Sequence, residues 1–219
     1  MRGLGDPLEM SEATAQELIP ARPSLTSLRR AAANCRACPL WRTGTQTVFG
    51  AGPARARVML VGEQPGDRED RAGEPFVGPA GEVLARALEE AGIERGDVYI
   101  TNVVKHFKWR QGRGKRRLHQ RPNAEEIEAC RPWLESELDV VRPEVVVCLG
   151  ATAAKALLGS DVRVTRDRGT FREADFAPTA TVTVHPSSIL RIEDDEERQE
   201  ARRELAADLR TVARRLNSA

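Results

Sequence analysis

The chain lacks the features that mark membrane-spanning and exported proteins. Its 219 residues contain no apolar run long enough to cross a bilayer, and the N-terminus has no signal-peptide core. Aromatic residues make up only 4%, and the net charge is only +1, so the charge total indicates no nucleic-acid partner. We therefore expect one cytoplasmic domain with no membrane partner, in which the local distribution of charge carries the information on binding.

Cysteine is also scarce, and in a cytoplasmic protein it is more often reduced or metal-bound than joined in disulfides. Cys35 and Cys38 form a C-x2-C pair, Cys130 lies on a predicted helix, and Cys148 ends a predicted strand. A thioredoxin-type role does not fit, because the pair neither follows a strand nor opens a helix. Four thiolates suit either zinc or an iron–sulfur cluster. Buried core cysteines would leave the C-x2-C pair unexplained.

Four apolar runs predict buried strands that alternate with helical patterns, near residues 57–61, 98–102, 144–149 and 180–184. This alternation predicts an α/β fold: a single domain with a mainly parallel four-stranded sheet flanked by helices. Residues 1–24 lack a sustained period, so we expect a mobile N-terminal tail and a domain that spans 25–217.

The first strand leads into a loop rich in glycine and proline. Gly-Glu-Gln-Pro-Gly occupies 62–66, and Pro-Phe-Val-Gly-Pro-Ala-Gly occupies 75–81. Such a loop lets backbone approach a ligand closely, although most loops of this kind only connect elements. Open α/β sheets bind ligands at the carboxyl ends of their strands. Parallel strands would gather the polar residues that follow them at one edge, namely Glu63, Gln64, Asn102 and His185.

Residues 105–121 form the most basic segment, with eight cations and no acid. Gly112 and Gly114 predict a loop, and Phe107 and Trp109 lie among the cations. A solvated basic loop, or one that neutralises acids elsewhere, is the simplest interpretation. The interleaved aromatic residues favour a loop that grips a nucleic-acid strand.

Together these motifs resemble those of the iron–sulfur uracil-DNA glycosylases, from about residue 35 to residue 190. The loops at 62–66 and 75–81 resemble the first active-site motif of that family, and His-Pro-Ser at 185–187 resembles its last. The C-x2-C and C-x17-C spacing resembles the family's ligand pattern. The resemblance therefore implies a structural [4Fe–4S] cluster bound by Cys35, Cys38, Cys130 and Cys148.

Lys-Arg-Arg-Leu-His at 115–119 resembles the KRRIH insert that marks the UdgX-type branch of this superfamily, with Leu118 for isoleucine. In that branch, the insert's histidine attacks the sugar carbon as uracil leaves and forms a stable covalent protein–DNA adduct. The resemblance thus implies that His119 is the nucleophile, which a neutral imidazole can be. The cations before it, Lys115, Arg116 and Arg117, would hold phosphates. Without the resemblance, the residues alone favour a phosphate contact for His119.

The resemblance also assigns residues to the base. Phe76 would stack on uracil, and backbone N–H groups of the turn at Gly62 would help to stabilise the leaving anion. Asn102 would read the base edge, since one amide offers an acceptor to uracil N3–H and a donor to O4. His185 would stabilise negative charge beside uracil O2.

The remaining roles implied by the resemblance are less specific. Glu63 would obstruct the thymine methyl group, or orient and deprotonate His119. Gln64 and Asp67 would position polar groups around the sugar or a water. Ser187, with the turn backbone, would support a flanking phosphate or the loop that intrudes into the DNA.

The resulting expectation is a single-turnover uracil-DNA glycosylase that forms a covalent adduct with single- or double-stranded uracil-containing DNA and acts as a monomer. One alternative is a conventional multiple-turnover iron–sulfur uracil-DNA glycosylase whose basic loop only grips DNA. A non-catalytic uracil-DNA-binding protein would instead form a reversible, salt-sensitive complex. A zinc-stabilised RNA-binding module is a further alternative, and a colourless protein would favour it.

Overall fold

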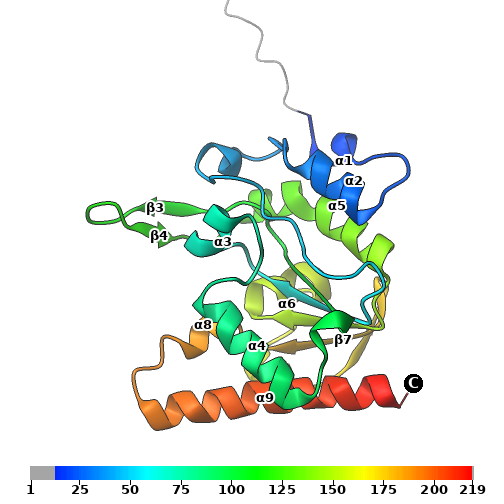
Figure 1. The fold of residues 1–219 in the computed structure, drawn as a ribbon, viewed down its shortest axis with the longest axis vertical. Coiled ribbons are helices and arrows are strands. Elements are labelled where there is room, and N and C mark those ends of the chain that lie inside the picture. The colour runs from blue at the N-terminus through cyan, green and yellow to red at the C-terminus, as the bar shows by residue number, and fades with distance from the viewer. Residues whose placement is uncertain (1–12, 219) are drawn as a thin grey trace, which may run out of the picture.

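The computed structural model describes residues 13–218 and has a five-stranded sheet at its centre, in the order β2-β1-β5-β7-β6 (Figure 1). Four strands run parallel: β1 (Val58–Gly62), β2 (Val98–Asn102), β5 (Val145–Leu149) and β7 (Ala177–Thr183). The predicted mainly parallel α/β fold is confirmed. The fifth strand, β6 (Arg172–Ala174), pairs antiparallel with β7 at the edge. It was not among the predicted strands, because three residues are too few to show an alternating pattern.

The parallel strands are apolar because both faces of the sheet are covered. Every residue of β1, β2 and β5 is buried, as expected for a parallel sheet between two helical layers. Alternate residues divide between two cores: Met59 and Val61 of β1 face one, and Val58 and Leu60 face the other.

Each core is closed by its own set of helices (Figure 1). The first set consists of α1 (Ala15–Leu18), α2 (Leu25–Ala32), α5 (Ala124–Val141) and α6 (Ala151–Leu158). The second set consists of α4 (Pro79–Ala91), α8 (Pro186–Ile189) and α9 (Asp195–Asn217). Two short helices, α3 (Asp67–Ala72) and α7 (Val164–Asp167), and two 3₁₀ turns, η1 (Pro39–Arg42) and η2 (Arg95–Asp97), complete the helical segments of the described chain. Across residues 13–218, no helix has the length and apolar character needed to span a membrane.

Helix ends follow local chemistry that is visible in the sequence. Asn123 caps α5 by accepting from the Glu126 N–H, while Glu126 accepts from the Asn123 N–H in return. Gly92 ends α4 in the left-handed conformation, with φ of 69°. Pro79 stands at the start of α4, where its missing N–H costs no hydrogen bond.

Part of the segment that was predicted as a mobile tail is helical. Residues 1–12 lie outside the described part of the chain, but α1 packs against α5 within the range that was expected to be mobile. Thr14 and Glu17 form a capping box around α1, and Ala15 is buried in the first core. Four residues are too few to show a helical period in the sequence.

The basic segment forms a hairpin. Its strands, β3 (Trp109–Gln111) and β4 (Arg117–His119), pair antiparallel, with Trp109 opposite His119. Gly114 takes a positive φ of 61° in the connecting turn. The hairpin extends away from the sheet (Figure 1). The glycines therefore mark the tip of a hairpin whose last residue is His119.

Candidate active site

A pocket of about 670 Å³ opens at the carboxyl edge of the parallel strands. The register brings these strand ends together, because Gly62 pairs with Asn102 and Leu149 pairs with Thr183. The hairpin strand β4 adds His119 from outside the sheet. The pocket therefore gathers seven of the sequence-predicted site residues, namely Glu63, Gln64, Phe76, Asn102, His119, His185 and Ser187.

The Asn102 side chain packs against the backbone of Gly62, which has no side chain of its own. A Cβ added there would lie 2.4 Å from Asn102 Oδ1 and 2.8 Å from Phe76 Cζ, so any side chain would displace both. Asn102 Oδ1 is buried and has no hydrogen-bond partner. An unpaired buried acceptor costs free energy until it meets a donor, so this oxygen is suited to receive an N–H group from a ligand.

Phe76 forms an aromatic wall of the pocket in a strained conformation. Its φ is 55°, a value that residues other than glycine rarely adopt. Gly81 permits this backbone, because a Cβ there would lie 1.7 Å from the Phe76 carbonyl oxygen. The rings of Phe76 and His185 are 5.8 Å apart between centroids. Strain of this kind persists where the surroundings fix it and is common at ligand sites.

His185 is held as a neutral hydrogen-bond donor. It caps α8, where its Nδ1 accepts from the Ser187 N–H at 3.2 Å and lies 2.8 Å from Ser187 Oγ. Because Nδ1 accepts, the ring proton belongs on Nε2. Burial lowers the pKa of His185 to about 4, so the ring is uncharged at neutral pH. Ser187 thus orients His185.

Glu63 is, with Glu69, one of the two acids that line the pocket, and three partners hold its carboxylate. Oε1 lies 3.3 Å from His119 Nε2, Oε2 lies 3.5 Å from Arg121 Nε, and the Thr152 hydroxyl donates to Oε2. Burial alone would raise the pKa of Glu63, but the hydrogen bonds from His119 and Thr152 and the charge of Arg121 outweigh it and lower the pKa. Sequence reasoning missed Thr152, whose only signal was its place after the carboxyl end of β5.

His119 lies at the mouth of the pocket, with its side chain 51% exposed. Its ring is 6.1 Å from that of Phe107 between centroids. Because Nε2 faces a carboxylate, Nε2–H can donate a hydrogen bond to Glu63. Nδ1 of His119 then carries the lone pair. The geometry thus joins a base, an imidazole and an open approach from solvent.

Gln64 fixes the hairpin rather than pointing a free amide into the pocket. Its Oε1 accepts from the Lys108 N–H at 3.1 Å, and its Nε2 donates to the Gln120 carbonyl at 2.9 Å. These bonds hold the chain on both sides of the hairpin. The sequence predicted a role for Gln64 at the sugar or a water. Its hydrogen-bond partners are instead backbone groups distant in the chain, which composition does not reveal.

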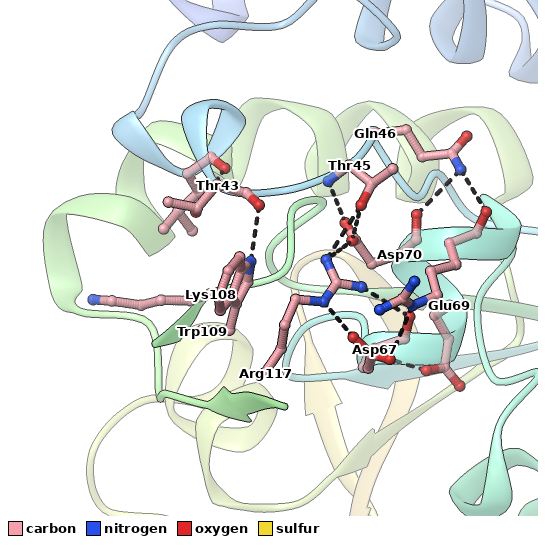
Figure 2. Close-up of polar contacts among 12 residues, drawn as sticks. Thr43, Thr45, Gln46, Asp67, Glu69, Asp70, Lys108, Trp109 and Arg117 are labelled. Carbon is pink, nitrogen blue, oxygen red and sulfur yellow. Dashed lines mark hydrogen bonds and ion pairs between the residues drawn. The ribbon is translucent and has the colours of Figure 1, made fainter. Parts of the chain in front are cut away.

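Arg117 joins the hairpin to α3 (Figure 2). Its guanidinium bonds the carboxylates of Asp67 and Asp70, the latter at 2.6 Å, and its side chain is only 9% exposed. The Phe107 and Trp109 rings lie 5.3 and 5.4 Å from the guanidinium carbon. Arg117 and Asp67 therefore form an anchor outside the pocket, which differs from the phosphate and sugar roles predicted for them.

The other cations of residues 105–121 fall into two groups. Lys105 is buried against Glu137, Lys108 pairs with Glu126, and Arg121 contacts Glu63. The exposed cations lie on the projecting hairpin, where they are free to meet an anionic partner: Arg110, Arg113, Lys115 and Arg116. Half of the basic segment therefore neutralises acids, as the simplest sequence interpretation allowed.

The four cysteines lie in or against the first core. Cys35, Cys130 and Cys148 are buried, and Cys38 is half-buried. The Lys105 N–H donates to Cys130 Sγ at 3.2 Å, and Trp133 Nε1–H donates to Cys35 Sγ at 3.3 Å. Burial raises the pKa of the Cys130 and Cys148 thiols to about 12.

Four thiol sulfurs suit either a zinc ion or an iron–sulfur cluster. Within residues 13–218, no three His, Cys, Asp or Glu side chains are grouped so that they could hold a metal ion. A zinc ion takes its ligands in one tetrahedron, whereas a [4Fe–4S] cluster attaches each cysteine to a different iron. The N–H groups that already bond two sulfurs suit cluster ligands, whose sulfurs accept hydrogen bonds.

His106 is expected to make the stability of the fold depend on pH. It is buried and hydrogen-bonded to Thr47 at 3.0 Å, and burial lowers its pKa to about 4 although the charge of Asp70 opposes this shift. Below the unfolded pKa of about 6.5, the unfolded chain takes up a proton that the folded chain resists. The free energy of unfolding should therefore fall as the pH falls from about 6.5 to 4, at up to about 1 kcal/mol per pH unit.

The variant His106→Gln tests this dependence. Glutamine can still donate to Thr47 but does not titrate, so the loss of stability between pH 7 and pH 5 should be smaller than in the wild type. Urea unfolding at the two pH values measures it. An equal loss in both proteins would assign the acid sensitivity to other groups, among them His185.

Comparison with known proteins identifies the family of the chain. Residues 49–210 match the Uracil DNA glycosylase superfamily. A type-4 uracil-DNA glycosylase of Pyrobaculum aerophilum is 38% identical over 176 residues, which cover 76% of this chain and 85% of that protein. A type-4 uracil-DNA glycosylase of Thermotoga maritima is 39% identical over 166 residues, which cover 75% and 82%.

A solved structure supports the fold alone. The crystal structure of Pedobacter heparinus SMUG2 superposes with a TM-score of 0.50 at 13% identity, over 75% of this chain and 77% of that one. The family match and the two type-4 relatives are the stronger findings, since they cover about three quarters of the chain. The chain belongs to the uracil-DNA glycosylase superfamily and is close to its type-4 members.

Proposed function

We propose that this protein excises uracil from DNA and captures the resulting abasic sugar covalently on His119. The glycosylase activity is supported by the type-4 relatives. The observation that carries the capture step is the proximity of His119 Nε2 to Glu63 Oε1, 3.3 Å, in the pocket that also contains Asn102 and His185.

Recognition of uracil uses the unpaired acceptor of the pocket. The base is flipped out of the DNA, since its glycosidic bond is otherwise inaccessible. Uracil N3–H bonds Asn102 Oδ1, while Phe76 stacks on the ring. Cytosine carries a lone pair at N3 instead of a proton, so it would leave Asn102 Oδ1 unpaired and be rejected.

Bond cleavage requires stabilisation of the leaving uracil. The C1′–N1 bond breaks with its electron pair going to uracil, and positive charge remains on the sugar. His185 donates from Nε2 to uracil O2, and backbone N–H groups of the turn at Gly62 to Gln64 assist it. A neutral imidazole suits this role, because its low pKa keeps the donor uncharged through the reaction.

Capture follows from the lone pair of His119. That lone pair forms a new bond to C1′, so the positive charge of the sugar moves to the imidazolium beside the Glu63 carboxylate. Uracil takes a proton from water. Lys115 and Arg116 hold the flanking phosphates and keep C1′ within reach of the ring.

A conventional glycosylase in which water attacks C1′ is the second candidate, favoured by the identity to type-4 relatives. One experiment separates the two. The protein is incubated with a uracil-containing oligonucleotide, and both free uracil and the products on a denaturing gel are measured. The proposal predicts at most one uracil per protein and a heat-resistant protein–DNA band. Many uracils per protein with no such band would contradict capture, and no uracil would contradict both candidates.

A [4Fe–4S] cluster bound by Cys35, Cys38, Cys130 and Cys148 is part of the proposal. When bound, it supplies a structural link between the segment that follows α2, helix α5 and strand β5. The hydrogen bonds to Cys130 and Cys35 support this assignment.

Removal of a cluster ligand tests this assignment through metal content and stability. We expect four irons and four sulfides per purified wild-type chain and a brown colour. Cys130→Ser should lose most of the iron and unfold at lower urea concentration, because metal binding contributes folding free energy. Stoichiometric zinc in the wild type would instead support the zinc alternative.

A further inference from the structure

Lys105 is a buried lysine that the mechanism above does not use. Its side chain is only 1% exposed, and its ammonium donates to Glu137 Oε2 at 2.5 Å. The same ammonium donates to Thr101 Oγ1 and to the Asn102 carbonyl oxygen, each at 2.7 Å. The three N–H groups of the ammonium therefore donate to one acid and to two consecutive residues at the carboxyl end of β2.

Glu137 is as deeply buried and as fully bonded as Lys105. Its carboxylate is 0% exposed and accepts from the Tyr99 hydroxyl at 2.8 Å, the Gly50 N–H at 3.0 Å and the Thr101 hydroxyl. Glu137 belongs to α5, which also carries Cys130. The Lys105 N–H bonds Cys130, so Lys105 ties the end of β2 to α5 through both its side chain and its backbone.

The hydrogen bonds of Lys105 reach Asn102, the residue to which the proposed function assigns contact with the base. Asn102 Oδ1 has no partner of its own, so no hydrogen bond to that oxygen fixes where it points. Its position depends on the Asn102 backbone, and the Lys105 ammonium holds that backbone by the carbonyl. Gly62, its register partner in β1, leaves space for the Asn102 amide, because a Cβ there would lie 2.4 Å from Asn102 Oδ1.

We propose that Lys105 is a positioning residue for base recognition, which holds the Asn102 carbonyl so that the Asn102 amide meets the edge of the flipped uracil. The inference rests on the proposed glycosylase function. Stability alone does not explain the pair, because apolar residues of similar volume often stabilise a core as well as a buried ion pair does. Orientation of Asn102 is what an apolar replacement could not supply.

A double-mutant cycle between Lys105 and Asn102 tests the proposal. The measured quantity is the single-turnover rate of uracil release from a uracil-containing oligonucleotide. We expect Asn102→Ala to lower this rate about 100-fold, and Lys105→Met to lower it about tenfold in the wild-type background. If Lys105 acts through Asn102, Lys105→Met should change the rate less than about twofold once Asn102 is alanine.

Two further variants keep the test decisive. Lys105→Met with Glu137→Gln removes both buried charges, and it replaces Lys105→Met if that variant fails to fold. Arg57→Met is the matched control: it breaks an ion pair with Glu144 next to the start of β1, at the opposite end of that strand from the pocket. It should lower stability without changing the release rate.

The possible results distinguish failure of the positioning role of Lys105 from failure of the proposed glycosylase function. Equal slowing by Lys105→Met in both backgrounds would overturn the positioning role, because a general loss of structure is independent of Asn102. Failure of both Lys105 variants to fold would also overturn it, since Lys105 would then serve the core. Absence of uracil release from the wild type would instead contradict the proposed function.

Discussion

His119→Ala should abolish the covalent protein–DNA band, with a loss of at least about 1000-fold in adduct yield, and should convert the protein into a multiple-turnover enzyme. Alanine removes the only ring that combines exposure with a contact to Glu63 among the described residues of the pocket. Asn102, Phe76 and His185 remain, so recognition and bond cleavage continue while water takes the vacated space beside C1′. The expected products are free uracil in excess of protein and alkali-labile abasic DNA.

The measurement combines a denaturing gel with a time course of uracil release. His119→Gln is the matched control, since it keeps a polar side chain of similar length without a nucleophilic nitrogen. Both variants should release uracil repeatedly. If neither releases any uracil, His119 is needed for cleavage rather than for capture. If the covalent band persists in both, another residue is the nucleophile.

Arg117→Met should lower the free energy of unfolding far more than Arg116→Met, although the two arginines are neighbours in one basic motif. Arg117 is 9% exposed and bonds Asp70, which is 0% exposed, so its loss leaves a buried carboxylate without its cation. Breaking a buried pair in this way costs about 3–5 kcal/mol. Arg116 is exposed, so its replacement should change the free energy of unfolding by about 0.5 kcal/mol or less.

Urea unfolding and the rate of adduct formation distinguish the two arginines. Arg117→Met should lower stability and slow capture more than cleavage, because the hairpin that carries His119 loses its anchor on α3. Arg116→Met should keep its stability but bind uracil-DNA with a weaker dependence on salt, since one phosphate contact is lost. Identical behaviour of the two variants would contradict the division of the basic segment into anchoring and DNA-facing cations.

The convergence of the pocket could be predicted because it follows from simple rules. Glu63, Asn102 and His185 each follow an apolar run, and parallel strands end at one edge of a sheet. Gly62 and Phe76 come from the same motif, and the structure adds the reason for the glycine, which is the close approach of the Asn102 amide.

The partners of the buried cations could not be predicted. Lys105, Arg117 and the exposed Arg116 look alike in a run of eight cations. What separates them are acids distant in the chain: Glu137 is 32 residues from Lys105, and Asp70 is 47 residues from Arg117. Composition and period describe neighbours along the chain, so long-range charge pairing leaves no local signal.

Identification of the adduct site by peptide mass spectrometry tests the central claim most directly. The wild-type protein is incubated with a short uracil-containing oligonucleotide, digested with nuclease and protease, and fragmented. The account predicts an abasic-sugar modification on a ring nitrogen of His119 and none on His106 or His185. A modification on a different residue, or no modified peptide together with repeated uracil release, would contradict it.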